Sequence, residues 1–341
     1  MDGSIRNLLS IVGTVMVTGL LSAAWLLDRY EAPPVDPAWA IAGDTDIPPE
    51  AVTVRFTGTS TLLFSDGTTA WMVDGWFSRP SPLALLLGTI EPDLNAIAAG
   101  LAANEVDHLA AVIPVHSHFD HAMDSPEVAR RTGAILLGSE STANIGRGWG
   151  LGEDQIRVAA DGEPHRFGAF TIRLIHTRHF EFADPQVRAQ ALEDQLITEP
   201  LVPPVETFAY KVGQPYAIHV THPKGGFLIQ ASAGYVEGGL TAYPAETVFL
   251  GIGGLGTQTA DYRENYWRET VDVVGAKRLY PIHWDSLMGP IEGPFTGELK
   301  AAAFLSAGTD HTLSFLQEKF AARPDLKVAT LPRYEPVVLF E

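Results

Sequence analysis

The chain has 341 residues, of which 46% are hydrophobic and 19% charged, with 32 Gly and 24 Pro, and this composition indicates a globular, loop-rich protein rather than a disordered one. Its formal net charge of -18 disfavours a nucleic-acid partner, because an acidic surface repels phosphate backbones. The chain has no cysteine, so disulfides and thiolate metal sites are excluded, and any metal must be held by His and carboxylate side chains.

An uncharged apolar run occupies residues 8–27, and these 20 positions are long enough to span a bilayer as a helix. Arg6 precedes the run and Asp28 follows it, a bias that places the N-terminus in the cytoplasm and the rest of the chain outside. Ser22-Ala23-Ala24 is also a passable small-residue cleavage site. We therefore expect residues 1–30 to be a transmembrane anchor or a signal peptide, and the protein to lie at the cell membrane or in the periplasm.

The next segment, 31–50, carries five prolines together with several acids, which is typical of an extended linker. The pattern changes at residue 52, so a single domain is expected over 51–341. Alternation of apolar and polar residues, short apolar runs and cap residues such as Ser125-Pro126 predict its elements. Strands are expected at 52–56, 61–64, 70–73, 109–115, 134–137, 170–175, 217–220, 227–229, 247–250, 278–282 and 327–331, and helices at 92–106, from 125, at 261–274 and at 309–322.

These elements form two similar halves, each with antiparallel strands followed by alternating strands and helices. That order predicts an α/β fold in which two mixed sheets lie back to back with helices outside, an αββα sandwich.

A cluster of metal-ligand residue types follows the predicted buried strand 109–115. It reads His116-Ser117-His118-Phe119-Asp120-His121. His116 and His118 are two residues apart and point the same way in an extended stretch, whereas Asp120 and His121 lie where the chain turns towards a helix and can face a second point nearby. Three imidazoles and a carboxylate in six residues are ligands for zinc, manganese or iron, so we expect two divalent metal ions, with zinc favoured.

This segment resembles the His-x-His-x-Asp-His motif of the metallo-β-lactamase superfamily of binuclear hydrolases. The resemblance extends from about residue 52 to residue 283 and implies an αββα sandwich with the site at one edge. Asp74 matches the family's early aspartate, which holds the His loop by hydrogen bonds; as the alternative, it is a turn residue before Gly75.

The family also requires a third His on the first metal and a last His on the second. The spacing around His179 resembles a branch that includes ascorbate-phosphate lactonase and N-acyl-phosphatidylethanolamine phospholipase D, which implies His179 as the ligand and leaves His176 on the pocket wall or the surface. His283 follows a strand near the end of the domain and matches the last ligand. His219 could face the pocket or be an ordinary strand residue, and His222 is expected in a surface turn.

One position departs from the family. A bridging aspartate is expected after the hairpin, but Ser232 stands at that place. A neutral hydroxyl is a poor ligand for a divalent ion, so the second metal is expected to bind more weakly than the first. If Ser232 is not at the bridge, Glu237 is the alternative carboxylate.

The expected function is hydrolysis of an ester-type bond in a lactone, a carboxylic ester or a phosphodiester. A bound metal lowers the pKa of water towards neutrality, and Asp120 would orient the hydroxide that attacks. Two long connections, 181–207 and 284–297, are expected to shape a partly apolar pocket for a small-molecule or lipid-like substrate, with the Gly-rich loop 138–150 as a further candidate. The alternative is a non-catalytic metal-binding or scaffold protein on the same fold.

Overall fold

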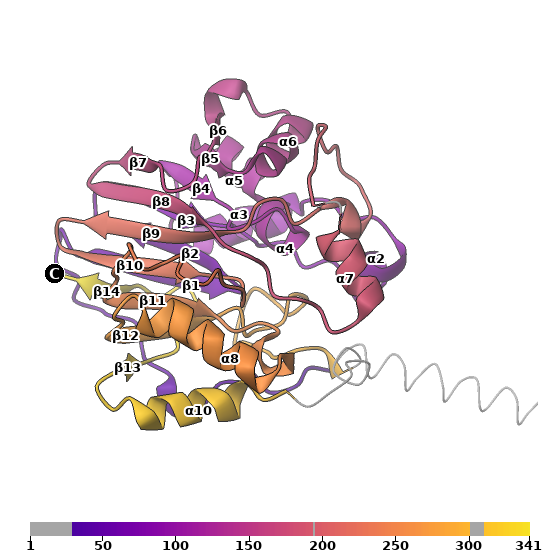
Figure 1. The fold of residues 1–341 in the computed structure, drawn as a ribbon. Coiled ribbons are helices and arrows are strands. Elements are labelled where there is room, and N and C mark those ends of the chain that lie inside the picture. The colour runs from indigo at the N-terminus through magenta and orange to yellow at the C-terminus, as the bar shows by residue number, and fades with distance from the viewer. Residues whose placement is uncertain (1–28, 194, 301–309) are drawn as a thin grey trace, which may run out of the picture.

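The computed structural model describes residues 29–193, 195–300 and 310–341, in which two mixed sheets of seven strands each lie face to face (Figure 1). The first sheet has the order β14 (Val337–Phe340), β1 (Val52–Gly58), β2 (Thr61–Ser65), β3 (Ala70–Val73), β4 (Ala111–Ile113), β5 (Ile135–Gly138) and β6 (Ile156–Val158). The second has the order β13 (Lys327–Val328), β12 (Arg278–Ile282), β11 (Thr247–Gly251), β10 (Gly225–Gln230), β9 (Tyr216–His222), β8 (Phe170–His176) and β7 (Pro164–Phe167).

Each sheet combines an antiparallel part with a parallel part. Strands β14, β1, β2 and β3 are antiparallel neighbours, and β3 to β6 run parallel. In the second sheet β7 to β10 are antiparallel neighbours, and β10 to β13 run parallel. The predicted αββα sandwich with two similar halves is therefore confirmed.

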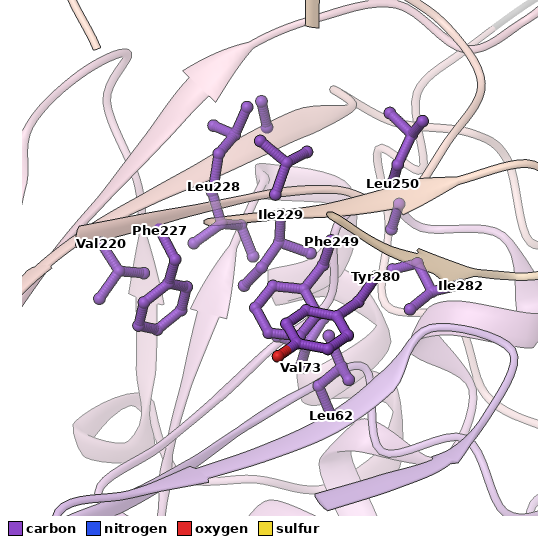
Figure 2. Close-up of a cluster of buried hydrophobic side chains, with 14 of the residues drawn as sticks. Leu62, Val73, Val220, Phe227, Leu228, Ile229, Phe249, Leu250, Tyr280 and Ile282 are labelled. Carbon is purple, nitrogen blue, oxygen red and sulfur yellow. The ribbon is translucent and has the colours of Figure 1, made fainter. Parts of the chain in front are cut away.

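The main core lies between the two sheets. Figure 2 shows Leu62 and Val73 of the first sheet pointing towards Phe249 of the second. Phe64 stacks on Phe227 with ring centroids 4.6 Å apart, and every one of these side chains is fully buried. Burial of an aromatic side chain of this size contributes about 1.5–3 kcal/mol, so this layer fixes the register of one sheet on the other.

Helices cover the outer faces of both sheets. On the first sheet, α3 (Leu94–Ala103), α5 (Ser125–Thr132) and α6 (Glu140–Trp149) bury a second apolar cluster that includes Met72, Ile97 and Val128. On the second, α8 (Ala260–Trp267) and α10 (Thr312–Ala322) lie side by side in Figure 1. Three further helices, α2 (Pro82–Leu87), α4 (Phe119–Ala122) and α7 (Pro185–Leu192), lie at the edge of the sandwich to which the parallel strands point. The remaining short turns are η1 (Pro37–Trp39), η2 (Glu153–Gln155), η3 (Thr207–Ala209), η4 (Leu255–Thr257) and the π-helical η5 (Arg268–Asp272).

The stretch 138–150, predicted as a Gly-rich loop, is instead helix α6. Ser139 caps this helix by accepting a hydrogen bond from the Thr142 N–H at 3.2 Å. Its glycines serve close packing, because a Cβ at Gly146 would lie 2.8 Å from Leu136 and one at Gly148 would lie 1.9 Å from the Leu201 carbonyl oxygen. The glycines of 138–150 therefore allow this helix to pack closely on its neighbours, and they do not mark a flexible loop.

Other boundaries shift for local reasons. The helix expected over 261–274 ends at Trp267 and continues as the π-helical turn η5. Of the strand expected over 327–331, only Lys327–Val328 pairs with β12, and Thr330 forms an isolated bridge with Ala40. The short strands β6, β7 and β14 and helix α2 were not predicted, because none of them has a long periodic pattern.

The Pro-rich stretch 31–50 packs along the body of the domain. Trp39 makes an edge-to-face contact with Phe320 of α10 at 4.8 Å, and its carbonyl accepts from the Thr330 N–H at 2.8 Å. The predicted span 8–27 lies outside the described residues. Within the ranges that the structure describes, no helix is long and apolar enough to cross a bilayer.

Candidate metal centre

Five strand ends deliver the predicted site residues to one edge of the sandwich. Asp74 follows β3, His116 follows β4, His179 lies three residues beyond β8, Ser232 follows β10 and His283 follows β12. These five strands point the same way within their sheets, so their carboxyl ends meet at one edge. His118 is the N-cap of α4, and Asp120 and His121 lie within that helix.

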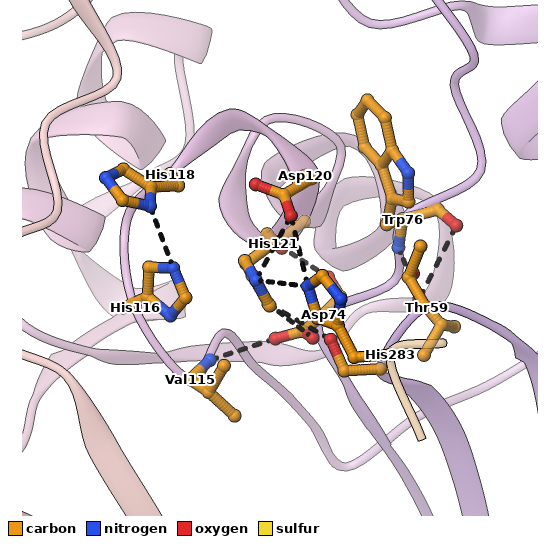
Figure 3. A network of polar contacts seen from close by, with 12 residues as sticks. Thr59, Asp74, Trp76, Val115, His116, His118, Asp120, His121 and His283 are labelled. Atoms are coloured by element: carbon orange, nitrogen blue, oxygen red, sulfur yellow. Dashed lines mark hydrogen bonds and ion pairs between the residues drawn. The ribbon is translucent and has the colours of Figure 1, made fainter. Parts of the chain in front are cut away.

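His116, His118 and His179 form the first donor group, with ligand nitrogens all within 4.8 Å of one another. His116 Nε2 lies 3.0 Å from His118 Nδ1 (Figure 3). The other nitrogen of His118 donates to the Ala191 carbonyl at 3.2 Å, and His179 Nδ1 donates to the Phe180 carbonyl at 2.8 Å. These bonds fix the tautomers, so His118 Nδ1 and His179 Nε2 are left with free lone pairs.

Asp120, His121 and His283 form the second donor group. Asp120 Oδ2 lies 3.3 Å from His121 Nε2 and 3.3 Å from His283 Nε2, and the two imidazole nitrogens lie 3.3 Å apart (Figure 3). His283 adopts a positive φ of 57°, and a Cβ at residue 253 would lie 2.5 Å from its Nδ1, so Gly253 allows this ring to take its place.

Asp74 connects the second donor group to the sheet. Its Oδ2 accepts from His121 Nδ1 at 2.9 Å, and its Oδ1 accepts from the Val115 N–H at 2.9 Å (Figure 3). Ser60 Oγ lies 3.1 Å from the same His121 nitrogen. Asp74 is fully buried. It therefore holds both the His121 ring and the backbone that leads into the His loop, as carboxylates that accept a hydrogen bond from a metal-ligand histidine do.

The electrostatics of the two groups differ. Burial, together with repulsion between neighbouring imidazoles, holds the pKa values of His116 and His179 well below the ordinary value. Burial opposes ionisation of Asp120, but His121 and His283 outweigh it and hold the pKa of Asp120 well below its ordinary value. Burial likewise opposes protonation of His121, but Asp120 and Asp74 raise its pKa to about 10.

This donor chemistry fits divalent cations. The first group presents neutral imidazoles with free lone pairs, and the second combines imidazoles with an ionised carboxylate, a set suited to zinc, manganese or iron. A cation bound to the second group would displace the proton from His121, which couples binding to proton release.

Ser232 lies at this edge without replacing the missing carboxylate. It lines the same cavity as both donor groups, it is buried, and its Oγ has no hydrogen-bond partner among the described residues. Gly234, two residues on, packs against the strand-end loop of β8, where a Cβ would lie 1.9 Å from the Arg178 carbonyl oxygen. Glu237 is exposed and does not line the cavity.

The other histidines lie elsewhere. His176, at the end of β8, is exposed and packs on Tyr216, outside both donor groups. His219 is buried and its Nε2 donates to the Pro244 carbonyl at 3.0 Å, so it is an ordinary strand residue. The expectation of a surface turn at His222 was wrong: its side chain is 5% exposed and its Nε2 lies 3.4 Å from Asp66 Oδ2.

Sequence reasoning missed Asp124, three residues beyond the motif. It is fully buried, and its carboxylate accepts the N–H groups of Phe77 and Ser78 at 2.8 and 2.6 Å and the Ser78 hydroxyl at 2.7 Å. It therefore ties the loop after Asp74 to the helix after the His loop. The sequence feature that could have identified Asp124 is its position, since it is an acidic residue three positions after His121.

A cavity of about 570 Å³ opens above the two donor groups. The predicted connection 181–207 contributes Phe182, Val187 and Ala191, and the connection 284–297 contributes Leu287. The stretch 138–150, the third candidate, does not line it. Aromatic and aliphatic side chains make up most of the wall, as expected for a partly apolar substrate.

Comparison with solved structures finds proteins that are similar to this chain. The chain is similar to the structure of Igni18, a novel metallo hydrolase from the hyperthermophilic archaeon Ignicoccus hospitalis KIN4/I, with 17% identity and a TM-score of 0.50 over 85% of this chain and 99% of that one. It is also similar to isothiocyanate hydrolase from Delia radicum gut bacteria, with 16% identity and a TM-score of 0.48 over 85% and 99% of the two chains. For the metallo-β-lactamase fold protein YhfI from Bacillus subtilis, the identity is 16% and the TM-score 0.45 over 83% and 98%. No family model matches the sequence, and no curated protein matches it.

The arrangement of the sheets and the likeness to Igni18 define the class of this protein by its fold, an αββα sandwich similar to that of a solved metallo hydrolase. Its strand ends bring together two groups of His and Asp side chains that could each hold a divalent metal ion. The closer resemblance to the lactonase and phospholipase branch stays a prediction.

Proposed function

We propose that this protein is a metal-dependent hydrolase of an ester-type bond, in a lactone, a carboxylic ester or a phosphodiester, and that zinc is its metal, with manganese or iron as alternatives. The observation that carries the proposal is the position of the two donor groups side by side beneath one cavity of about 570 Å³. Divalent ions held there supply Lewis acidity and lower the pKa of water.

The protein's own residues supply the rest of the chemistry. Asp120 is ionised and 8% exposed at the base of the cavity, so it can accept a hydrogen bond from an attacking water and orient it. Asp74 and the carbonyls of Ala191 and Phe180 hold three of the imidazoles in fixed orientations. Such preorganisation keeps the donors in place without cost at the moment of reaction.

The wall of the cavity supports a substrate with an apolar body. Phe119, Phe182, Val187 and Leu287 offer it hydrocarbon surface, and Glu206 is the charged side chain on the wall outside the donor groups. A carboxylate there opposes an anionic substrate body. This favours neutral lactones and carboxylic esters over phosphodiesters within the proposed class.

The decisive experiment assays purified protein of known metal content on lactone, carboxylic ester and phosphodiester substrates with matched apolar chains. The double variant His116→Ala, His118→Ala should lose the first metal equivalent and turnover. Asp120→Asn should lower kcat about 10²–10⁴-fold, as expected for loss of a proton acceptor. His176→Ala is the matched control, because this exposed histidine lies at the end of the same strand that leads to His179, and it should leave both metal content and kcat unchanged.

The alternative, a non-catalytic metal-binding or scaffold protein, is motivated by Ser232 in place of a bridging carboxylate. It predicts metal content without turnover on any substrate of the panel. Full metal content in the double His variant would instead overturn the assignment of the first donor group.

A further inference from the structure

Helix α2 presents an apolar face to solvent. Leu83, Leu86 and Leu87 lie at spacings of three and four residues, so they share one face of the helix, and they are 67%, 76% and 83% exposed. The opposite face packs inwards, where Ala84 and Leu85 contact the buried cluster around Trp76. Exposed leucines are unremarkable one at a time, but three on one short helix form a contiguous patch.

This patch continues into the cavity above the donor groups. Leu86 and Leu87 line the cavity as well as being exposed, and so does Phe208, which is 40% exposed. Helix α2 is joined to the turn that carries Phe208, because the Thr207 hydroxyl donates to the Leu85 carbonyl at 2.8 Å. Ile90 and Val205 also exchange backbone hydrogen bonds of 2.8 and 3.1 Å. We define the patch as Leu83, Leu86, Leu87 and Phe208. Because these hydrogen bonds join its two segments, the patch lies at the opening of the cavity in a fixed arrangement.

The start of the described chain lies beside the same cavity. The Tyr30 hydroxyl donates to the Met288 carbonyl at 3.1 Å, and the preceding residue, Leu287, lines the cavity. The described chain therefore begins close to a residue of the cavity wall, and in the sequence it is preceded by the apolar run 8–27, whose 20 residues match a bilayer in length.

We propose that the patch docks on a neutral or zwitterionic lipid surface, so that the apolar chain of an amphiphilic substrate passes from that surface directly into the cavity. The helix supplies hydrocarbon and no charge, since its residues are Pro82–Leu87, PLALLL. The exposed Glu91 and Glu206 flank it, and the net charge of the chain is -18, so an anionic surface is repelled. The substrate part of this inference rests on the proposed function, whereas docking itself does not.

The absence of cysteine from the sequence allows a direct test on the full chain. Leu87→Cys is labelled with an environment-sensitive fluorophore and mixed with zwitterionic vesicles that carry a lipid-attached quencher. Val158→Cys is the matched control, because this residue is also apolar and 42% exposed but lies on edge strand β6, away from α2 (Figure 1). We expect emission at residue 87 to rise several-fold in vesicles without quencher and to fall when the quencher is present, with no change at residue 158.

Two further measurements test the same proposal, one with a second substitution and one with a different lipid composition. Leu83→Gln in the Leu87→Cys chain should reduce the change at residue 87, because it removes apolar surface outside the cavity, and adding anionic lipid should reduce it too. Equal responses at residues 87 and 158 overturn the proposal. So does a change at residue 87 that depends on protein concentration without vesicles, because that result assigns the patch to a second copy of the chain. None of these measurements needs turnover, so a failed substrate panel and a failed docking test are distinguishable.

Discussion

Asp74→Asn tests whether the buried carboxylate that accepts from His121 holds the second donor group in place. Asp74 accepts two hydrogen bonds of 2.9 Å, from His121 Nδ1 and the Val115 N–H, in a fully buried position. An amide keeps the size and tolerates the positive φ of 59° at this residue, but its NH₂ group must face one of the two donors. One buried donor is then unsatisfied, at a cost of about 1–3 kcal/mol.

The loss should appear in metal affinity. Removing the hydrogen-bond partner of a metal-ligand histidine weakens metal binding about 10–100-fold, which corresponds to about 1.4–2.8 kcal/mol and agrees with the cost of the lost hydrogen bond. Calorimetric titration of metal-stripped protein with zinc, resolving the two equivalents, measures it. We expect the second equivalent to weaken by that factor and the first to change less, because the first donor group has no direct bond to Asp74.

Asp66→Asn is the matched control. Asp66 also accepts two backbone hydrogen bonds, from Thr68 and Thr69 at 2.9 and 2.7 Å, and its Oδ2 lies 3.4 Å from a histidine, His222. That histidine belongs to neither donor group, so the variant should lose stability without losing metal. If Asp74→Asn binds both equivalents as tightly as Asp66→Asn does, the reasoning about Asp74 is refuted.

Three more predictions follow from other parts of the chain. Ser232→Asp should tighten the second metal equivalent, because a charged oxygen replaces a neutral one, and identical titration curves for wild type and variant would place Ser232 away from the metals. Burial raises the pKa of Glu127, but bonds from Arg131, Trp149 and Arg130 outweigh it and lower that pKa below 4.5. Because the folded-state pKa is depressed, this contribution is present above pH 4.5 and lost as the pH falls through the folded value. Glu127→Gln should therefore lower the free energy of unfolding at neutral pH by about 1–3 kcal/mol, and urea unfolding over a pH series should show the gap closing in acid; a constant gap contradicts this. Finally, the domain should be accessible to protease in intact spheroplasts, and a protected domain that is soluble inside the cell defeats the location proposed from residues 8–27.

The short-range part of the candidate site could be predicted from the sequence. Residues 116–121 lie in one hexapeptide, so their joint chemistry needs no knowledge of the fold. The strands were recognisable because a buried strand of a parallel sheet is a short apolar run, as in β4 and β11. The ligand after β8 was harder to assign, because His176 and His179 are both close to the end of that strand. The family spacing favoured His179, and the structure brings His179 to the first donor group.

The sequence by itself determined the residue types of the site, the αββα order of the elements and the absence of thiolate ligands, because these depend on composition and on periodicity along the chain. Only the tertiary structure decided which donors converge, since it brings Asp120 and His121 of helix α4 next to His283, which is distant in sequence. It also showed that 138–150 is a helix whose glycines allow close packing, and that α2 turns three leucines outwards at the mouth of the cavity. Both depend on which neighbours a residue meets, and a local pattern carries no record of contacts made across the fold.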